Sequence, residues 1–115
     1  MLKQYINENK SAILTTWQDL HAIPEWGKQE FKTSAYLKEL LHKHGIETTD
    51  LTTTGFIAEV QGATAGPILG LRADMDALPY KNEKGETYYL HACGHDAHST
   101  IGAWTLIALK ELNLI

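Results

Sequence analysis

Residues 97–113 form the segment that most constrains the fold. Apolar side chains lie on nearly all sides of a helix drawn through this segment: Ile101, Trp104, Leu106, Ile107, Ala108, Leu109 and Leu112. A helix that is apolar all round is normally buried by other elements rather than laid on a surface. The sequence therefore predicts a buried helix near the end of the chain, with an apolar surface at Leu106–Ile115 that other structure should cover. Where nothing covers it, we expect the chain to self-associate.

Two other segments have helical patterns. Near the start, large apolar residues follow one stripe of a helix that ends before Pro24: Ile6, Ile13, Trp17 and Leu20. A second helix is predicted over 28–44, where Phe31 and Leu37 share an apolar side and Gly45 takes the position that commonly follows a helix end. These two helices precede all the predicted strands.

Short strands are expected between the helices. Phe56, Ala58 and Val60 alternate with other residues after a Thr-rich connector at 48–54. The run Ile68–Leu71 is apolar throughout, which is typical of a strand buried on both faces. A polar loop follows at 81–87. The order of elements indicates an α/β fold, a helix-covered sheet of which two strands are only a part.

Composition narrows the class of protein. The chain has 115 residues, 43% of them hydrophobic and 21% charged, which is enough for one globular domain or part of one. Ten Lys and Arg against 14 Asp and Glu give a net charge of −4, which argues against a nucleic-acid partner. No apolar run is long enough for a membrane span and no signal peptide is recognisable, so a cytoplasmic protein is expected.

Residues 91–98 carry the most informative cluster. They contain three of the six histidines and the only cysteine. If 91–95 is extended, His91, Cys93 and His95 point to the same side and can converge on one cation. His98 would lie near the first turn of the last helix, and Asp96 would serve as an N-cap or as a carboxylate that orients a ligand histidine. Ligand softness favours zinc, with manganese or cobalt if carboxylates complete the site.

A second candidate group follows the predicted buried strand. Asp74 and Asp76 are two residues apart, so on a continuing strand they would share a face. Two close carboxylates require a cation, a shared proton or an arginine, and Arg72 or a metal could serve. A solvated strand end capped by acidic residues is the other interpretation. By contrast, His21 alone is most simply a hydrogen-bonded structural histidine.

Four motifs in order resemble the N-terminal part of a known enzyme family. The chain is similar to the amidohydrolase branch of the aminoacylase/carboxypeptidase zinc metallopeptidases, which includes hippurate hydrolase, indole-acetyl-amino-acid hydrolases and N-acetyl-diaminopimelate deacetylase. The motifs are Leu20-His-Ala-Ile-Pro-Glu25, Glu30-Phe-Lys-Thr33, Leu71-Arg-Ala-Asp-Met-Asp-Ala-Leu-Pro79 and His91-Ala-Cys-Gly-His-Asp-Ala-His98. The resemblance implies that residues 1–115 are the N-terminal portion of a zinc-peptidase-like catalytic domain.

The resemblance also implies roles for individual residues. Cys93 and His95 match the first two ligands of a centre that holds two ions in the complete site, and Asp76 matches an acidic residue that orients the metal-bound cluster. Asp74 stands where other branches of the superfamily have a ligand histidine. Asp74, His91, Asp96 and His98 are therefore expected to be supporting residues or further ligands.

The same resemblance implies metal-dependent hydrolysis of the amide bond of N-acyl amino acids or small peptides. In the family, two cations about 3.5–4 Å apart hold a hydroxide, a glutamate accepts its proton and a metal polarises the scissile carbonyl. That glutamate, the remaining ligands and a second domain for dimerisation and closure match positions beyond the equivalent of Ile115. We therefore expect the isolated chain to bind zinc weakly and to be inactive, and to associate with itself or with a separate C-terminal half.

Two other interpretations compete with the enzyme portion. In one, His91, Cys93, His95 and His98 close a four-ligand structural zinc site with no position open for water. In the other, the chain is an interaction domain that only retains the fold. Metal stoichiometry distinguishes the three hypotheses.

Overall fold

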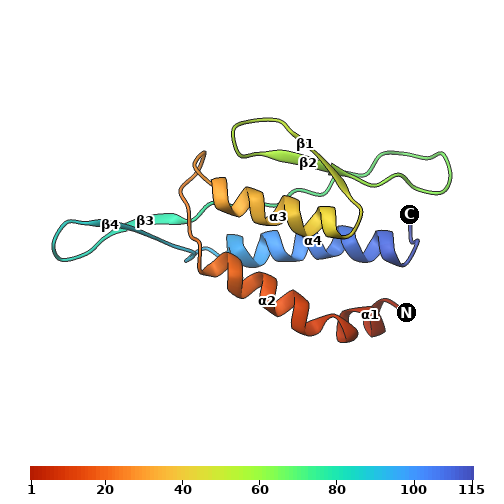
Figure 1. Cartoon of the computed structure of the whole chain (residues 1–115), viewed down its shortest axis with the longest axis horizontal. Helices are drawn as coiled ribbons and strands as arrows, with labels where there is room; N and C mark the ends of the chain where they lie inside the picture. The colour runs from red at the N-terminus through yellow and green to blue at the C-terminus, as the bar shows by residue number, and fades with distance from the viewer.

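A computed structural model describes the whole chain, residues 1–115. It measures 57 × 31 × 21 Å, with both termini at the same end (Figure 1). The elements in order are α1 (Leu2–Glu8), α2 (Lys10–His21), α3 (Phe31–Lys43), β1 (Glu47–Asp50), β2 (Phe56–Glu59), β3 (Leu78–Lys81), β4 (Thr87–Leu90) and α4 (His95–Glu111). The predicted mixture of helices and small sheets is confirmed.

The helices form the body of the molecule. In Figure 1, α4 lies between α2 and α3, and the β1–β2 hairpin lies along α3. Four buried residues make the central cluster, Leu41, Ile46, Trp104 and Ile107. Leu41 lies in α3, Trp104 and Ile107 lie in α4, and Ile46 directly follows Gly45. The core is therefore built where α3 and α4 meet.

The helix ends follow local sequence signals. The first predicted helix is divided at Asn9, whose side-chain amide donates to the Tyr5 carbonyl at 2.9 Å, and α2 ends at His21, before Pro24. The prediction that Gly45 follows the end of α3 is confirmed, since its φ is +72°. The predicted start at 28 was wrong: α3 begins at Phe31, and the Phe31 side chain is exposed.

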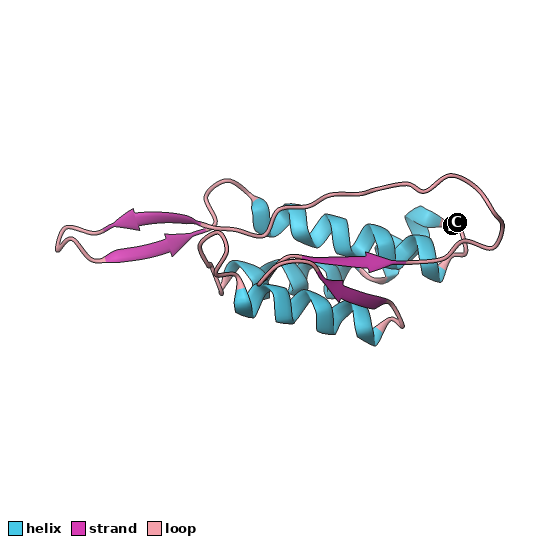
Figure 2. Cartoon of the chain, turned by 90° about the horizontal axis from the view of Figure 1, so that it is seen from above, coloured by secondary structure: helices cyan, strands magenta, loops and turns pink.

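Two antiparallel hairpins replace the predicted sheet. In the first, β1 pairs with β2, with Glu47 opposite Glu59 and Asp50 opposite Phe56. The predicted strand at Phe56 is confirmed, but part of the Thr-rich connector is itself a strand. In the second hairpin, β3 and β4 flank the predicted polar loop, with Leu78 opposite Leu90. This hairpin extends beyond the ends of the helices (Figures 1 and 2).

The prediction of a buried strand at Ile68–Leu71 was wrong. Ile68 is 100% exposed, Leu69 89% and Leu71 61%, and Figure 2 shows this region as a loop that runs along the molecule between β2 and β3. A buried strand needs neighbouring strands at both edges to satisfy its backbone groups. No strand of this chain lies beside residues 68–71, because β1 and β2 pair with each other.

The last helix is buried on one side only. Trp104, Ile107 and Ala108 are buried against the other helices, whereas Ile101 is 65% exposed. Much of the apolar surface expected at Leu106–Ile115 is therefore covered within the chain, although Leu114 and Ile115 remain exposed. No helix is both long and apolar enough to cross a membrane.

Candidate metal centre

The residues singled out by sequence meet at the N-terminal end of α4. Three segments come together there: the end of α2, residues 72–77 before β3, and residues 91–96, which run from β4 into α4. Figure 1 shows the C-terminal end of α2 beside the N-terminal end of α4.

His95 is held by Asp76. Its Nδ1 lies 2.8 Å from Oδ1 of Asp76 and 3.0 Å from the Asp76 backbone oxygen. Both acceptors are oxygens, so Nδ1 carries the proton and Nε2 keeps its lone pair. A carboxylate that binds one nitrogen of an imidazole in this way orients the other nitrogen for a cation and makes it more basic.

Cys93 lies on the loop between β4 and α4 and is a free, exposed thiol. The condition under which His91, Cys93 and His95 would share a side, an extended segment at 91–95, is not met. Strand β4 ends at Leu90, and Gly94, with φ +80°, turns the chain into α4, which begins at His95. The side chains of His91, Cys93 and His95 are therefore not aligned by a strand.

His91 and His98 occupy different environments. The His91 ring is buried, 7% exposed, and neither of its nitrogens has a hydrogen-bond partner. Burial lowers the pKa of His91, which favours the neutral ring. His98 is exposed on α4, and its Nδ1 accepts a hydrogen bond from the Asp74 N–H at 3.4 Å. The four side chains proposed for a closed zinc site are not brought together, since no three His, Cys, Asp or Glu residues are grouped to hold a metal ion.

Asp96 binds His21 rather than a predicted ligand histidine. The two side chains meet at 2.7 Å, between His21 Nδ1 and Asp96 Oδ2, and the Asp96 side chain is 3% exposed. Burial raises the pKa of Asp96, but hydrogen bonds from His21 and from the Ala97 N–H outweigh it, so the pKa lies below its ordinary value. Asp96 is therefore an ionised, buried carboxylate.

The two carboxylates expected to share a face take different partners. Asp74 pairs with Arg72 at 2.6 Å, as the sequence allowed, whereas Asp76 pairs with His95. The Ser99 hydroxyl donates to the Asp74 carbonyl. Residues 74–76 are thus attached to the first turns of α4 through both backbone and side chains.

The interpretation of His21 as a hydrogen-bonded structural histidine is confirmed by its contact with Asp96, but sequence reasoning missed the role of Glu25. Besides the His21 contact, the Glu25 carbonyl accepts the Ala77 N–H at 2.7 Å. The Glu25 carboxylate accepts the backbone N–H groups of Lys32 and Thr33 at 3.0 and 2.7 Å, which satisfies donors at the start of α3. The N-cap residue is Glu30, which makes no side-chain cap hydrogen bond, so the lack of a Ser, Thr, Asp or Asn cap is the signal that could have indicated a capping group from elsewhere.

The donors present fit part of a metal site. An exposed thiol and an oriented imidazole nitrogen are ligands that zinc prefers, and both lie at the N-terminal end of a helix. Both ring nitrogens of the buried His91 also lack a hydrogen-bond partner, so they remain available to bind another group. Two ligands do not complete a zinc site, so any cation here needs further ligands.

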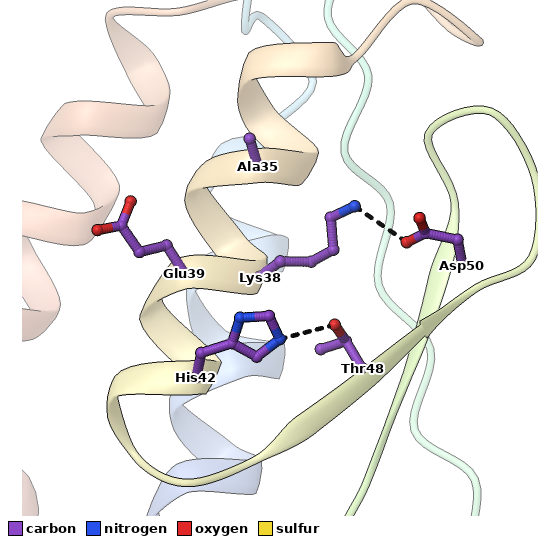
Figure 3. Close-up of a pocket in the computed structure, with 6 residues that line it drawn as sticks. All are labelled: Ala35, Lys38, Glu39, His42, Thr48 and Asp50. Carbon is purple, nitrogen blue, oxygen red and sulfur yellow. Dashed lines mark hydrogen bonds and ion pairs between the residues drawn. The ribbon is translucent and has the colours of Figure 1, made fainter.

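One surface hollow lies away from these residues. It is a groove of about 450 Å³ between α3 and β1, and it contains none of the predicted site residues (Figure 3). Lys38 pairs with Asp50 and His42 bonds to Thr48 within it, each at 2.9 Å. These two pairs satisfy one another, and Glu39 in the same groove lies 3.7 Å from Lys43 Nζ.

Comparison with known proteins gives one consistent result. Residues 70–114 match the model of peptidase family M20/M25/M40. The chain is 39% identical over 99 residues to N-acetyl-L-cysteine deacetylase of Bacillus subtilis, covering 80% of this chain and 24% of that protein. It is 40% identical over 102 residues to N-acetyldiaminopimelate deacetylase of a Geobacillus species, covering 82% and 27% respectively.

A solved structure is similar as well. The crystal structure of the Bacillus subtilis YXEP protein, described as a dinuclear metal binding peptidase from the M20 family, matches with a TM-score of 0.79 and 33% identity. The match covers 90% of this chain and 31% of that one. The chain thus spans roughly a quarter of the length of the curated relatives it matches.

Proposed function

We propose that this chain, which is similar to the N-terminal part of metallopeptidases of the M20 family, provides the first ligands of a metal centre that hydrolyses amide bonds. The substrate class is an N-acyl amino acid or a small peptide, in line with the deacetylases to which the chain is similar. The observation that carries the proposal is the Asp76–His95 contact, which leaves His95 Nε2 available for a cation.

Individual residues take the following roles in this proposal. Cys93 and His95 bind the metal, Asp76 orients His95, and Arg72 neutralises Asp74 beside the site. Four nearby residues support these ligands or add a further ligand: Asp74, His91, Asp96 and His98. Zinc suits the thiolate and imidazole, with manganese or cobalt as alternatives, and two ions fill the complete site. When bound, the metal lowers the pKa of a water and polarises the scissile carbonyl.

The residues of this chain prepare the site without completing the reaction. Asp76 holds the Nδ1 proton of His95, which keeps Nε2 aimed away from the carboxylate. Cys93 lies just before the start of α4, with its thiol exposed. A reducing compartment such as the cytoplasm would keep that thiol free of disulfides. We expect the 115 residues alone to show no turnover, because no glutamate of this chain matches the family's general base.

The exposed run at 68–71 supports a partner that completes the fold. Ile68, Leu69 and Leu71 are exposed together on a segment with no neighbouring strand. Polypeptide carrying the remainder of the family fold would bury this run and bring the missing ligands. In its absence, contact between copies of the chain is the expected substitute. The closed four-ligand zinc module is not proposed, since its four side chains are not grouped.

A chimaera tests the proposed reaction. Residues 1–115 replace the matching part of the Bacillus subtilis N-acetyl-L-cysteine deacetylase, to which the chain is 39% identical over 99 residues. We expect metal-dependent hydrolysis of N-acetyl-L-cysteine by the chimaera, loss of that activity in Cys93→Ala, and none with the 115 residues alone. A folded chimaera whose hydrolysis survives Cys93→Ala would contradict the assignment.

A further inference from the structure

The hydrogen bond between His21 and Asp96 joins the end of α2 to the first turn of α4. The two residues are 75 positions apart in the sequence, and their side chains meet at 2.7 Å. The His21 ring is also flanked on two sides, by Trp17 with ring centres 5.8 Å apart and by His91 at 6.4 Å. Contacts with these two rings, as well as the bond to Asp96, therefore orient the His21 ring.

Asp96 directly follows His95 and is the second residue of α4. Its side chain is 3% exposed, and a buried carboxylate requires hydrogen-bond donors. The donors are His21 Nδ1 and the Ala97 N–H, while the Thr100 hydroxyl donates to the Asp96 carbonyl at 2.8 Å. Removing His21 would leave the carboxylate with one strong donor and free it to turn toward water.

His95 is restrained from two directions. Asp76 fixes its ring, and the Asp96–His21 contact fixes the backbone turn from which that ring projects. Only Gly94 separates Cys93 from His95. Its φ is +80°, and as a glycine it has no side chain to restrict the backbone at this point. The geometry of the Cys93–His95 pair therefore depends on the anchor that follows it.

We propose that His21 is a positioning residue for the metal-binding loop: through Asp96 it holds the first turn of α4, and thereby sets the directions from which Cys93 and His95 reach one cation. This inference rests on the proposed metal centre. It differs from a purely structural role in one respect, since it predicts that metal affinity falls more than the loss of stability alone explains.

A matched contact between the same two helices provides the control. The Trp104 indole N–H donates to the Thr16 hydroxyl at 3.0 Å, and this contact also joins α2 to α4, within the core. Thr16→Val removes that acceptor and weakens the helix pair without touching the loop. His21→Asn keeps an N–H group near the position of Nδ1, whereas the amide of His21→Gln is placed further out, near the position of Nε2.

The test is a Co²⁺ titration of the full 115-residue chain under reducing conditions, followed by the thiolate-to-cobalt absorption band. We expect His21→Gln and His21→Ala to weaken binding about tenfold, the size of effect seen when groups that support a ligand are removed. His21→Asn should bind nearly as well as the unmodified chain. Thr16→Val should lower the melting temperature without changing the Co²⁺ affinity.

The outcomes separate this inference from the metal centre itself. A thiolate band that Cys93→Ala removes, but that His21→Gln leaves at the unmodified concentration, would overturn the positioning role alone. Equal losses of affinity in His21→Gln, His21→Asn and Thr16→Val would also overturn it, because they would follow stability. If the unmodified chain gave no thiolate band, the proposed metal centre would fail and this inference with it.

Discussion

His95 Nδ1 lies 2.8 Å from Oδ1 of Asp76, a residue 19 positions earlier in the chain. The contact assigns the proton to Nδ1 and leaves Nε2 for a cation, so in the proposed metal centre Asp76 would act on the metal through His95. Asp76→Asn keeps the shape of the side chain but removes its charge. We expect this variant to bind Zn²⁺ about 10–100-fold more weakly, because the imidazole becomes less basic.

Competition with a chromophoric chelator measures that change. Asp50→Asn is a suitable control, since Asp50 pairs with Lys38 in the groove between α3 and β1. The control should bind zinc as the unmodified chain does. Equal zinc affinity for Asp76→Asn and the unmodified chain would show that Asp76 does not orient a ligand.

The left-handed conformation of Gly94 gives a second prediction. Its φ is +80°, and a Cβ added there would meet no atom within 4 Å. Gly94→Ala should therefore destabilise the fold by about 1 kcal/mol through backbone conformation alone. Gly85, with φ +75° and equally open surroundings, is the matched position in the β3–β4 turn.

Urea unfolding of both variants, together with zinc affinity, tests this prediction. The two substitutions should lower the free energy of unfolding by similar amounts, and only Gly94→Ala should weaken zinc binding. A Gly85→Ala variant that lost zinc as strongly would show that the effect does not depend on the loop.

Some of this fold follows from local sequence, and some does not. The periodicity of residues 97–113 and the glycine at 45 predicted α4 and the end of α3, because helices are specified by residues close in sequence. The apolar run 68–71 predicted a strand that is not formed, because pairing depends on segments distant in the chain. The polar strand at 47–50 was missed because its pairing with β2, rather than an apolar pattern, defines it.

The candidate site divides in the same way. The spacing of Cys93 and His95 could be read directly, and it led to both as ligand candidates. Their hydrogen-bond partners could not be read from spacing. Asp76 lies 19 positions before His95, and Asp96 contacts His21, 75 positions earlier, which was interpreted as a structural histidine. Spacing also suggested that Asp96 orients a ligand, whereas folding places a different carboxylate on His95.

The ionisation of Tyr36 provides a third prediction. Burial and the Asp19 carboxylate, 2.6 Å from its hydroxyl, raise the pKa of Tyr36 to about 12 from 10.0. Between these pH values the folded chain keeps a proton that the unfolded chain releases. The stabilisation is therefore complete below the ordinary pKa and is lost as the pH rises through the folded value.

Tyr36→Phe removes this linkage. We expect it to cost about 0.5–1.5 kcal/mol at neutral pH, the usual contribution of one hydrogen bond, and to make the free energy of unfolding fall less steeply in alkali. Urea unfolding over a pH series, with tyrosinate absorbance, measures both effects. If the alkaline slope were the same in the variant, another group would be responsible.

Exposed apolar residues give a fourth prediction. Ile68 and Leu69 are 100% and 89% exposed on a segment without a neighbouring strand, so they should drive association between copies of the chain. Replacing both with lysine should reduce the mass measured by light scattering. Ile101→Lys, on the exposed side of α4, is the control and should leave association unchanged. An unmodified chain that is monomeric in light scattering would contradict the prediction.

The central claim is that residues 1–115 provide the first two ligands of an incomplete metal centre. Isothermal titration of the reduced chain with Zn²⁺ tests it most directly, with Cys93→Ala, His95→Ala and His42→Ala compared. We expect weak binding of one ion that both site variants abolish and that His42→Ala, in the groove between α3 and β1, retains. Zinc binding that is tight, or that persists in Cys93→Ala and His95→Ala, would contradict the claim.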